Sequence, residues 1–117
     1  MKTDYLDTYR HYAEQMQVLG ERLGAPMAGF SQLHNASVAE GALSSKIKEL
    51  IALAIGITVR CNGCIAFHVH DALKAGASAQ EVLETIGVAV MMGGGPSVIY
   101  GITAMEALDQ FEKKGLD

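Results

Sequence analysis

Arginine is scarce in this chain of 117 residues, and the shortage of positive charge narrows the classes of possible partner. Arg10, Arg22 and Arg60 are the three arginines, and nine basic residues stand against thirteen acidic ones, which gives a formal net charge of −4. Proteins that bind nucleic acids usually carry a basic surface. The composition therefore argues against a nucleic-acid partner.

Long apolar segments are also lacking. The longest apolar run extends from Leu50 to Val59, about half of the roughly 20 residues that a membrane-spanning helix needs. The first residues do not have the basic and then apolar pattern of a signal peptide. We therefore expect a cytoplasmic protein without a membrane partner. In that reducing compartment a cysteine pair is more often catalytic or metal-binding than a permanent crosslink.

Aromatic residues make up only 6% of the chain, whereas half of all residues are apolar, so the predicted core is aliphatic. The length fits a single domain that spans residues 1–117. A domain of this size cannot bury so much apolar surface by itself. We therefore predict that identical chains associate into a homo-oligomer.

No segment alternates between apolar and polar residues as a half-buried strand does, and helical spacing is found instead. One amphipathic stripe consists of Tyr5, Tyr9, Tyr12, Met16, Leu19 and Leu23. A second helix is expected from Ser44 or Ser45 to about Val59, with a serine cap and a largely apolar circumference typical of a buried helix. A third is expected from Cys61 to about Lys74. We predict an all-α fold with about five to six helices.

Glycine, serine and proline mark the boundaries of the later helices. Gly76 is expected as a left-handed C-cap, and Ser78 with Glu81 has the spacing of a capping box. Pro96 fits the first turn of a last helix. The sequence MMGGGPSV, residues 91–98, lacks the lysine of a phosphate-binding loop, so we interpret it as a tight turn between helices. Residues 25–44 are expected to contain one short helix.

The two cysteines of the chain lie three residues apart in the sequence RCNGCIAFHVH, residues 60–70. At about 100° per residue, Cys61, Cys64 and His68 fall within about 60° of one another on a helix, whereas His70 lies roughly opposite Cys61. His68 is one turn from Cys64, close enough to exchange a proton with its thiol. The start of a helix also favours a thiolate. This pattern favours a reactive dithiol.

The cysteine pair has two other possible interpretations, a zinc site and a permanent disulfide. Zinc could take Cys61, Cys64 and His68 as ligands, but structural zinc sites usually draw two ligand pairs from segments separated by a longer loop. A permanent disulfide across so short a loop would constrain the unfolded chain very little. We therefore predict no metal and no cofactor.

Glu49 stands at the head of the apolar run and is the second unusual residue. By itself it fits a solvent-facing carboxylate in the first helical turn. If it were enclosed, its pKa would rise and it could act as an acid or base. His11 and His34 are expected to be surface or internally satisfied histidines. Met91 and Met92 are expected to fill a core or an interface.

Two consecutive segments, KELIALAIGITVRCNGCIAFHVHDALKAGAS and AQEVLETIGVAVMMGGGPSVIYG, carry a resemblance to a known family. They resemble the carboxymuconolactone decarboxylase superfamily, and within it the alkylhydroperoxidase D-like branch. The likeness covers about residues 40 to 108. Its anchor is a glutamate twelve residues before C-x-x-C-x-x-x-H, which corresponds here to Glu49, Cys61, Cys64 and His68.

The resemblance implies an oligomeric helical bundle and a role for each anchor residue. Cys64 would attack a peroxide, Cys61 would resolve the product as a disulfide, His68 would act as base for Cys64, and Glu49 would face the thiols and relay protons. The implied activity is that of a thiol-dependent peroxidase or disulfide reductase with an antioxidant role. Its partners would be a peroxide and a dithiol or lipoyl-type electron donor. The expected oligomer is a hexamer built as a trimer of dimers.

One position differs from the pattern of the branch. Independently of that position, the sequence is compatible with two alternative functions. The best-known peroxidases of the branch have a histidine directly before the second cysteine, where this chain has Gly63. The decarboxylase branch, a lyase acting on a lactone, resembles the second half of the sequence but typically lacks the cysteine pair. A redox-sensing oligomer without catalytic activity is the other alternative.

Overall fold

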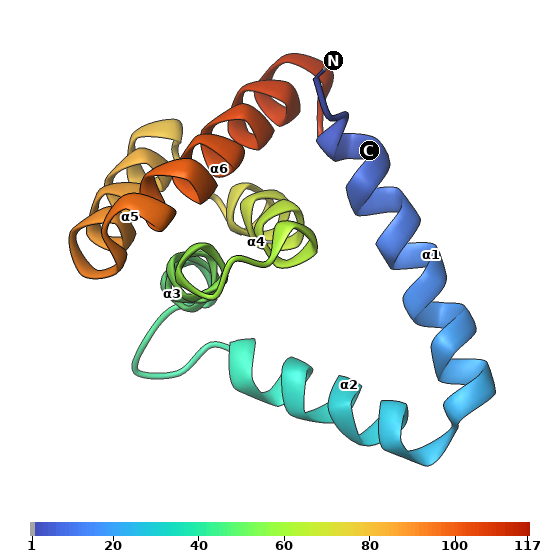
Figure 1. Ribbon diagram of the computed structural model, residues 1–117. Coiled ribbons are helices and arrows are strands. Elements are labelled where there is room, and N and C mark those ends of the chain that lie inside the picture. Colours follow the sequence, from blue (N-terminus) through green and yellow to red (C-terminus); the bar gives the residue numbers. More distant parts are fainter. Residues whose placement is uncertain (1) are drawn as a thin grey trace.

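The computed structural model describes residues 2–117, and six α-helices account for most of them (Figure 1). They are α1 (Tyr5–Leu23), α2 (Ala25–Val38), α3 (Ser45–Thr58), α4 (Asn62–Lys74), α5 (Ala79–Gly93) and α6 (Gly95–Lys114). No strand occurs within the described residues, which confirms the all-α prediction. None of the described helices is both long and apolar enough to cross a membrane.

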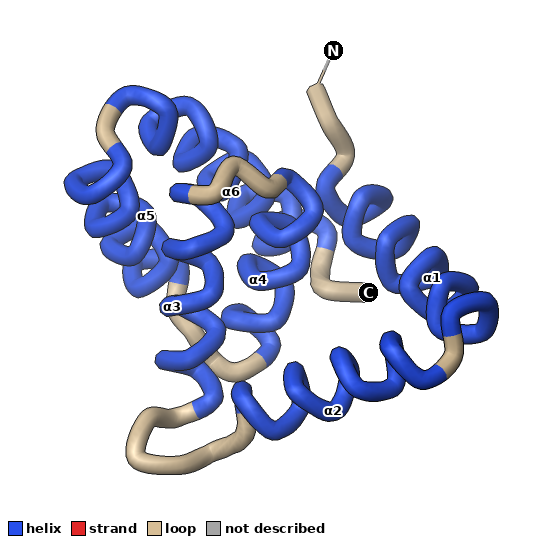
Figure 2. The backbone as a smooth tube through the Cα atoms, turned by 60° about the horizontal axis from the view of Figure 1, so that its bottom comes forward, coloured by secondary structure: helices blue, strands red, loops and turns tan. Residues whose placement is uncertain are grey.

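The helices α3, α4, α5 and α6 pack together and enclose the aliphatic core (Figure 2). Leu53 and Ile57 of α3 meet Ile65 and Val69 of α4 within this core, and all four side chains are fully buried. Phe111 of α6 is the largest of the fully buried side chains there. The helix α4, which carries the cysteine motif, is therefore packed against other helices on several sides.

The helices α1 and α2 form an arm that reaches away from this core (Figure 1). The first turn of α1 is anchored, because Tyr5 and Leu6 are buried, whereas Leu19 and Leu23 at its far end are exposed. The apolar stripe predicted for α1 is therefore divided between a core-packing half and an uncovered half. The second helix has 14 residues and is longer than the short helix predicted for residues 25–44.

The prediction that the helix after Ser45 is buried on nearly all sides is wrong for the single chain. Leu53 and Ile57 are fully buried, but Ile51 and Ile55 on another face are 45% and 56% exposed. The cause is the position of α3 at the edge of the four-helix group, where one side of the helix meets no other element of the same chain.

The predicted helix boundaries are confirmed at several caps. The Ser44 hydroxyl accepts a hydrogen bond from the amide of Ile47 at 3.1 Å. Ser78 and Glu81 form the predicted capping box at the start of α5, and Gly76 has a φ of 100°. The turn between α5 and α6 is also confirmed as a close helix approach. A β-carbon at Gly93 would collide with the side chain of Ser97.

The junction between α3 and α4 sets the position of the first cysteine. Arg60 has a φ of 62°, a left-handed conformation that is uncommon for residues other than glycine. The amide of Arg60 donates to the carbonyl of Ile57, and the amide of Cys61 donates to the carbonyl of Gly56, both at 3.1 Å. This pair of bonds is a Schellman motif. Cys61 thus closes α3 and is at the same time the N-cap of α4.

Candidate functional site

Cys61 and Cys64 are joined by a disulfide at the start of α4. Cys61 precedes the helix as its N-cap, and its sulfur accepts a hydrogen bond from the amide of Cys64 at 3.2 Å. Both cysteines are partly buried. A helix N-terminus concentrates free amide groups and positive potential, which stabilise a thiolate when the disulfide is reduced.

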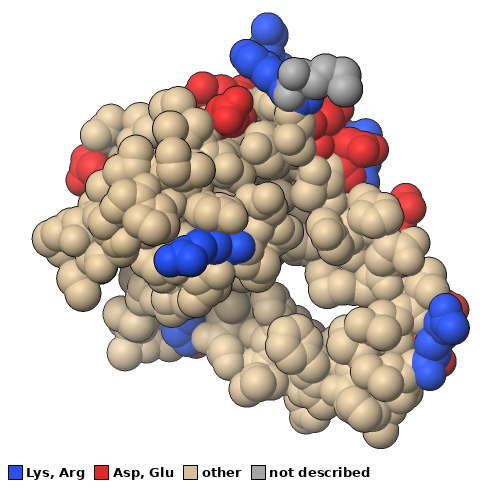
Figure 3. All heavy atoms as spheres, in the orientation of Figure 1, with Lys and Arg blue, Asp and Glu red and all other residues tan. Residues whose placement is uncertain are grey.

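The disulfide lies in the wall of a pocket of about 790 Å³ between the arm and the core. Residues from three helices line it, among them Tyr12 and Met16 of α1, Met27, Phe30 and His34 of α2, and Phe67, His68 and Asp71 of α4. Figure 3 shows an opening between the arm and the core, in a face with few charged side chains. The lining is largely apolar and includes neither lysine nor arginine. A small uncharged molecule could therefore reach the sulfur atoms.

The side chain of Glu49, on α3, lies next to the imidazole of His68, on α4. Its Oε1 is 3.6 Å from Nδ1 of His68, and the two side chains are 6% and 19% exposed. This separation is too long for a hydrogen bond, and both atoms are buried without a hydrogen-bond partner. The solvent-facing interpretation of Glu49 is wrong, because the packing of α3 against α4 encloses the carboxylate. Burial of two unpartnered polar groups side by side is typical of a site that handles protons.

His70 takes a different position on the same helix. Its side chain is almost fully buried, with Nδ1 2.8 Å from Oδ1 of Asp71. Its Nε2 lies 2.9 Å from the carbonyl oxygen of Leu116, and because a carbonyl can only accept, Nε2 is the donor. The ring stacks on Tyr9 with a centroid distance of 3.7 Å. His70 thus lies apart from the cysteines, as its angle on the helical wheel predicts.

Tyr9 belongs to this structural cluster around His70. Burial raises the pKa of its hydroxyl, and the negative charges of Asp71 and Asp117 raise it further. Tyr9 therefore stays neutral at physiological pH, and its ring serves to pack against the imidazole of His70.

One imidazole and one carboxylate of the pocket, those of His34 and Asp71, were not predicted as site residues. His34 of α2 was expected on the surface or in a satisfied position, but it lines the pocket, and its ring centroid is 6.5 Å from that of His68. No spacing in the sequence connects positions 34 and 68, because the fold alone brings α2 near α4. Asp71 follows His68 by three residues, a helical spacing that could have indicated it.

Glu49, His68 and Asp71 are the residues of the described chain that could hold a metal ion. Each can offer one donor atom, and these atoms lie within 4.8 Å of one another. Two carboxylates and an imidazole suit first-row divalent cations such as zinc or manganese. The alternative zinc set of Cys61, Cys64 and His68 shares only His68 with this group, and its two cysteines are bonded to each other.

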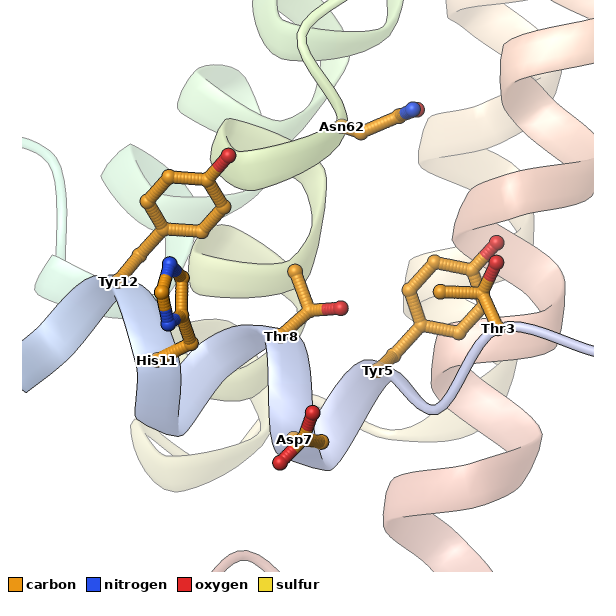
Figure 4. A pocket seen from close by; sticks show the side chains of 7 residues that line it. All are labelled: Thr3, Tyr5, Asp7, Thr8, His11, Tyr12 and Asn62. Atoms are coloured by element: carbon orange, nitrogen blue, oxygen red, sulfur yellow. The ribbon is translucent and has the colours of Figure 1, made fainter.

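Tyr12 of α1 lies over Gly63, the position at which the sequence departs from the resembled branch. A β-carbon at Gly63 would lie 3.4 Å from Cε2 of Tyr12. Tyr12 and Asn62 also line a second, smaller cavity of about 340 Å³. Figure 4 shows His11 beside Tyr12 in this second cavity. The two cavities thus share Tyr12 and Asn62, and His34 lines the larger cavity whereas His11 lines the smaller one.

Comparisons with known proteins agree with this architecture. A solved structure of an apo carboxymuconolactone decarboxylase family protein from Legionella pneumophila matches with a TM-score of 0.87 and 40% identity, covering 92% of this chain and 96% of that one. A family protein from Thermotoga maritima, described as a possible participant in antioxidative response, matches with a TM-score of 0.79 and 26% identity. That match covers 93% of this chain and 96% of the other.

Sequence comparison supports the same assignment. An uncharacterized protein from Cupriavidus necator is 31% identical over 93% of this chain and 96% of its own length. The model of the carboxymuconolactone decarboxylase family matches residues 25–107. The family that Glu49 and the C-x-x-C-x-x-x-H motif predicted is therefore confirmed, and the chain belongs to the carboxymuconolactone decarboxylase family.

Proposed function

We propose that the protein is a dithiol oxidoreductase that reduces a peroxide with Cys61 and Cys64, and that an external dithiol regenerates the pair. The observation that carries this proposal is the disulfide at the N-terminus of α4, in the wall of a pocket, with His68 and the buried Glu49 close by. The antioxidative description of the Thermotoga maritima relative supports the same chemical class.

The proposed reaction balances with two electrons from the two thiols. The Cys64 thiolate attacks one peroxide oxygen, the O–O bond breaks, and Cys64 becomes a sulfenic acid while an alcohol leaves. The Cys61 thiolate then attacks the sulfenic sulfur and forms the disulfide as the S–O bond breaks. The hydroxide that leaves takes up the proton that Cys61 lost and departs as water. A dithiol donor, such as a lipoyl compound, reduces the disulfide by thiol exchange and is itself oxidised.

His68 and Glu49 have proton-transfer roles in this scheme. His68 lies one helical turn from Cys64 and takes up its thiol proton. Glu49 faces the imidazole from α3 at 3.6 Å, and a small approach of the two groups would produce a hydrogen bond. The carboxylate would then stabilise the imidazolium that forms when His68 holds the proton.

The attacking role is assigned to Cys64 because it has His68 beside it, although the N-cap position also stabilises a thiolate at Cys61. The two possibilities predict different trapped products. In Cys61→Ser a peroxide should leave a Cys64 sulfenate that can be trapped, whereas Cys64→Ser should not react in this way. If Cys61 is instead the sulfur that is oxidised first, the two roles are exchanged.

Peroxide consumption with several dithiol donors, dihydrolipoamide included, tests the proposal. We expect multiple turnovers by the wild type and none by Cys64→Ser, while Ser37→Ala on the exposed surface of α2 serves as a matched control. Consumption of no peroxide with any donor, although the disulfide is reduced, would contradict the peroxidase function. Disulfide reduction without peroxide turnover would instead indicate a disulfide reductase.

We also propose that the active form is a cytoplasmic hexamer, built as a trimer of dimers. Large apolar side chains are exposed on several helices of the single chain, including Ile55 at 56%, Ile99 at 63%, Met91 at 72% and Met92 at 75%. Contiguous exposed apolar surface usually marks an interface. Light scattering at micromolar concentration should give six times the 12.4 kDa chain mass. The mass of one chain would exclude an oligomer, and a dimer or trimer would change the number only.

A further inference from the structure

His34 brings a second imidazole into the pocket from a helix that does not carry the cysteines. It belongs to α2, is partly buried, and lines the same pocket as Cys64 and His68. Its ring is tilted by 25° from the ring of His68, with 6.5 Å between the centroids. For nearly parallel rings, direct face-to-face contact needs only about 3.5–4 Å. The two imidazoles therefore lie close together in one pocket without stacking directly on each other.

The two histidines face different neighbours. The Nδ1 atom of His68 points toward the buried Glu49, and its position one turn from Cys64 suits it to the thiol proton. His34 has no such neighbour among the described ion pairs and hydrogen bonds, and it lies on the opposite, α2 side of the pocket. Histidine is the side chain that exchanges protons most readily near neutral pH.

A leaving oxygen in this pocket needs a proton donor, because the apolar lining stabilises an alkoxide or hydroxide poorly. Neither lysine nor arginine lines the pocket, and apart from the cysteines and the two histidines its polar lining side chains are amides, hydroxyls and the carboxylate of Asp71, which at neutral pH accepts hydrogen bonds rather than donating them. We propose that His34 is the general acid that protonates the oxygen leaving from the peroxide, while His68 serves the thiol of Cys64. This inference rests on the proposed peroxidase function.

The step assigns each proton and electron pair. The Cys64 thiolate forms the S–O bond with the terminal peroxide oxygen, and the O–O bond breaks with its electron pair on the other oxygen. The imidazolium of His34 gives that oxygen its proton, which releases an alcohol. Neutral His34 is then protonated again from solvent through the open side of the pocket.

The leaving group provides a sharp test of this role. The reduced wild type and His34→Gln are mixed with tert-butyl hydroperoxide, with peracetic acid and with iodoacetamide, and the loss of thiols is followed over one turnover. The alkoxide leaving group needs a proton, whereas acetate and iodide do not. We expect His34→Gln to react about 100-fold more slowly with the alkyl hydroperoxide and within ~3-fold of wild type with the other two reagents.

Two further variants complete the experiment. If circular dichroism shows that His34→Gln is poorly folded, His34→Asn replaces it, and we expect the same pattern of rates with the three reagents. His11→Gln, in the smaller cavity, should match the wild type with all three reagents. Equal slowing of His34→Gln with every reagent would place His34 in thiolate formation and overturn the inference, as would no slowing at all. A wild type that neither peroxide oxidises would instead refute the peroxidase function itself.

Discussion

The two histidines of α4, His68 and His70, are two residues apart and have opposite surroundings. Both ring nitrogens of His70 have partners, in Asp71 and in the carbonyl of Leu116, and its ring is stacked on Tyr9. The Nδ1 atom of His68 is buried beside Glu49 without a hydrogen bond. The same residue type on one helix thus serves packing on one face and is available for chemistry on the other.

The difference has an energetic meaning. A buried polar group without a partner costs about 1–3 kcal/mol, whereas the paired nitrogens of His70 avoid that cost. Proteins retain such unpaired groups mainly at functional sites. Substitutions on the His68 face are therefore expected to change rates, and substitutions on the His70 face are expected to change stability.

The largest effect is expected from His68→Gln. Loss of the base beside Cys64 should lower the rate of the peroxide reaction by about two to four orders of magnitude. The melting temperature should stay close to that of the wild type, because the His68 ring has no hydrogen bond at Nδ1 to lose. Single-turnover kinetics and thermal denaturation measure the two quantities. A fall in stability with an unchanged rate would reverse the comparison of the two faces.

Glu49→Gln is expected to have the next largest effect. The amide keeps the shape of the carboxylate but cannot stabilise an imidazolium by charge, so we expect a rate loss of about 100-fold. Stability should change little, since a neutral amide is less costly to bury than an unpaired carboxylate. The rate of the peroxide reaction is measured over a range of pH for both proteins. A pH–rate profile identical to that of the wild type would return Glu49 to a purely structural role.

His70→Leu tests the other face and should act on stability alone. The leucine leaves Asp71 and the carbonyl of Leu116 without their hydrogen-bond partner and removes the stack on Tyr9. The free energy of unfolding should therefore fall by about 2–3 kcal/mol. Urea denaturation gives this free energy. The folded variant should oxidise its thiols at the wild-type rate, and His11→Leu on the exposed side of α1 provides the control. A rate loss in folded His70→Leu would mean that the two faces are coupled.

Local signals in the sequence predicted the elements whose causes are local. Ser44, Ser78 and Glu81 cap their helices through bonds to residues three positions away, so spacing alone identified them. The joint position of Cys61, Cys64 and His68 at the start of one helix was predictable for the same reason.

Features that depend on packing between helices were not predictable in this way. The carboxylate of Glu49 is enclosed only because α3 packs against α4, and the residue by itself fitted a solvent-facing position; the family resemblance indicated the enclosed one. His34 reaches the pocket through the angle between α1 and α2, which no local pattern specifies. The exposed face of α3 is a further example, since apolar residues around a helix do not tell which side has a neighbour.

The contact between Tyr12 and Gly63 has a consequence for the evolution of this chain. A β-carbon at Gly63 would lie 3.4 Å from the tyrosine ring, in van der Waals contact with it, so the imidazole of a histidine there would compete with Tyr12 for the space beyond the β-carbon. A lineage with this tyrosine therefore reaches histidine at 63 most easily after Tyr12 has become smaller. The order of the two substitutions matters, and positions 12 and 63 should change together among descendants.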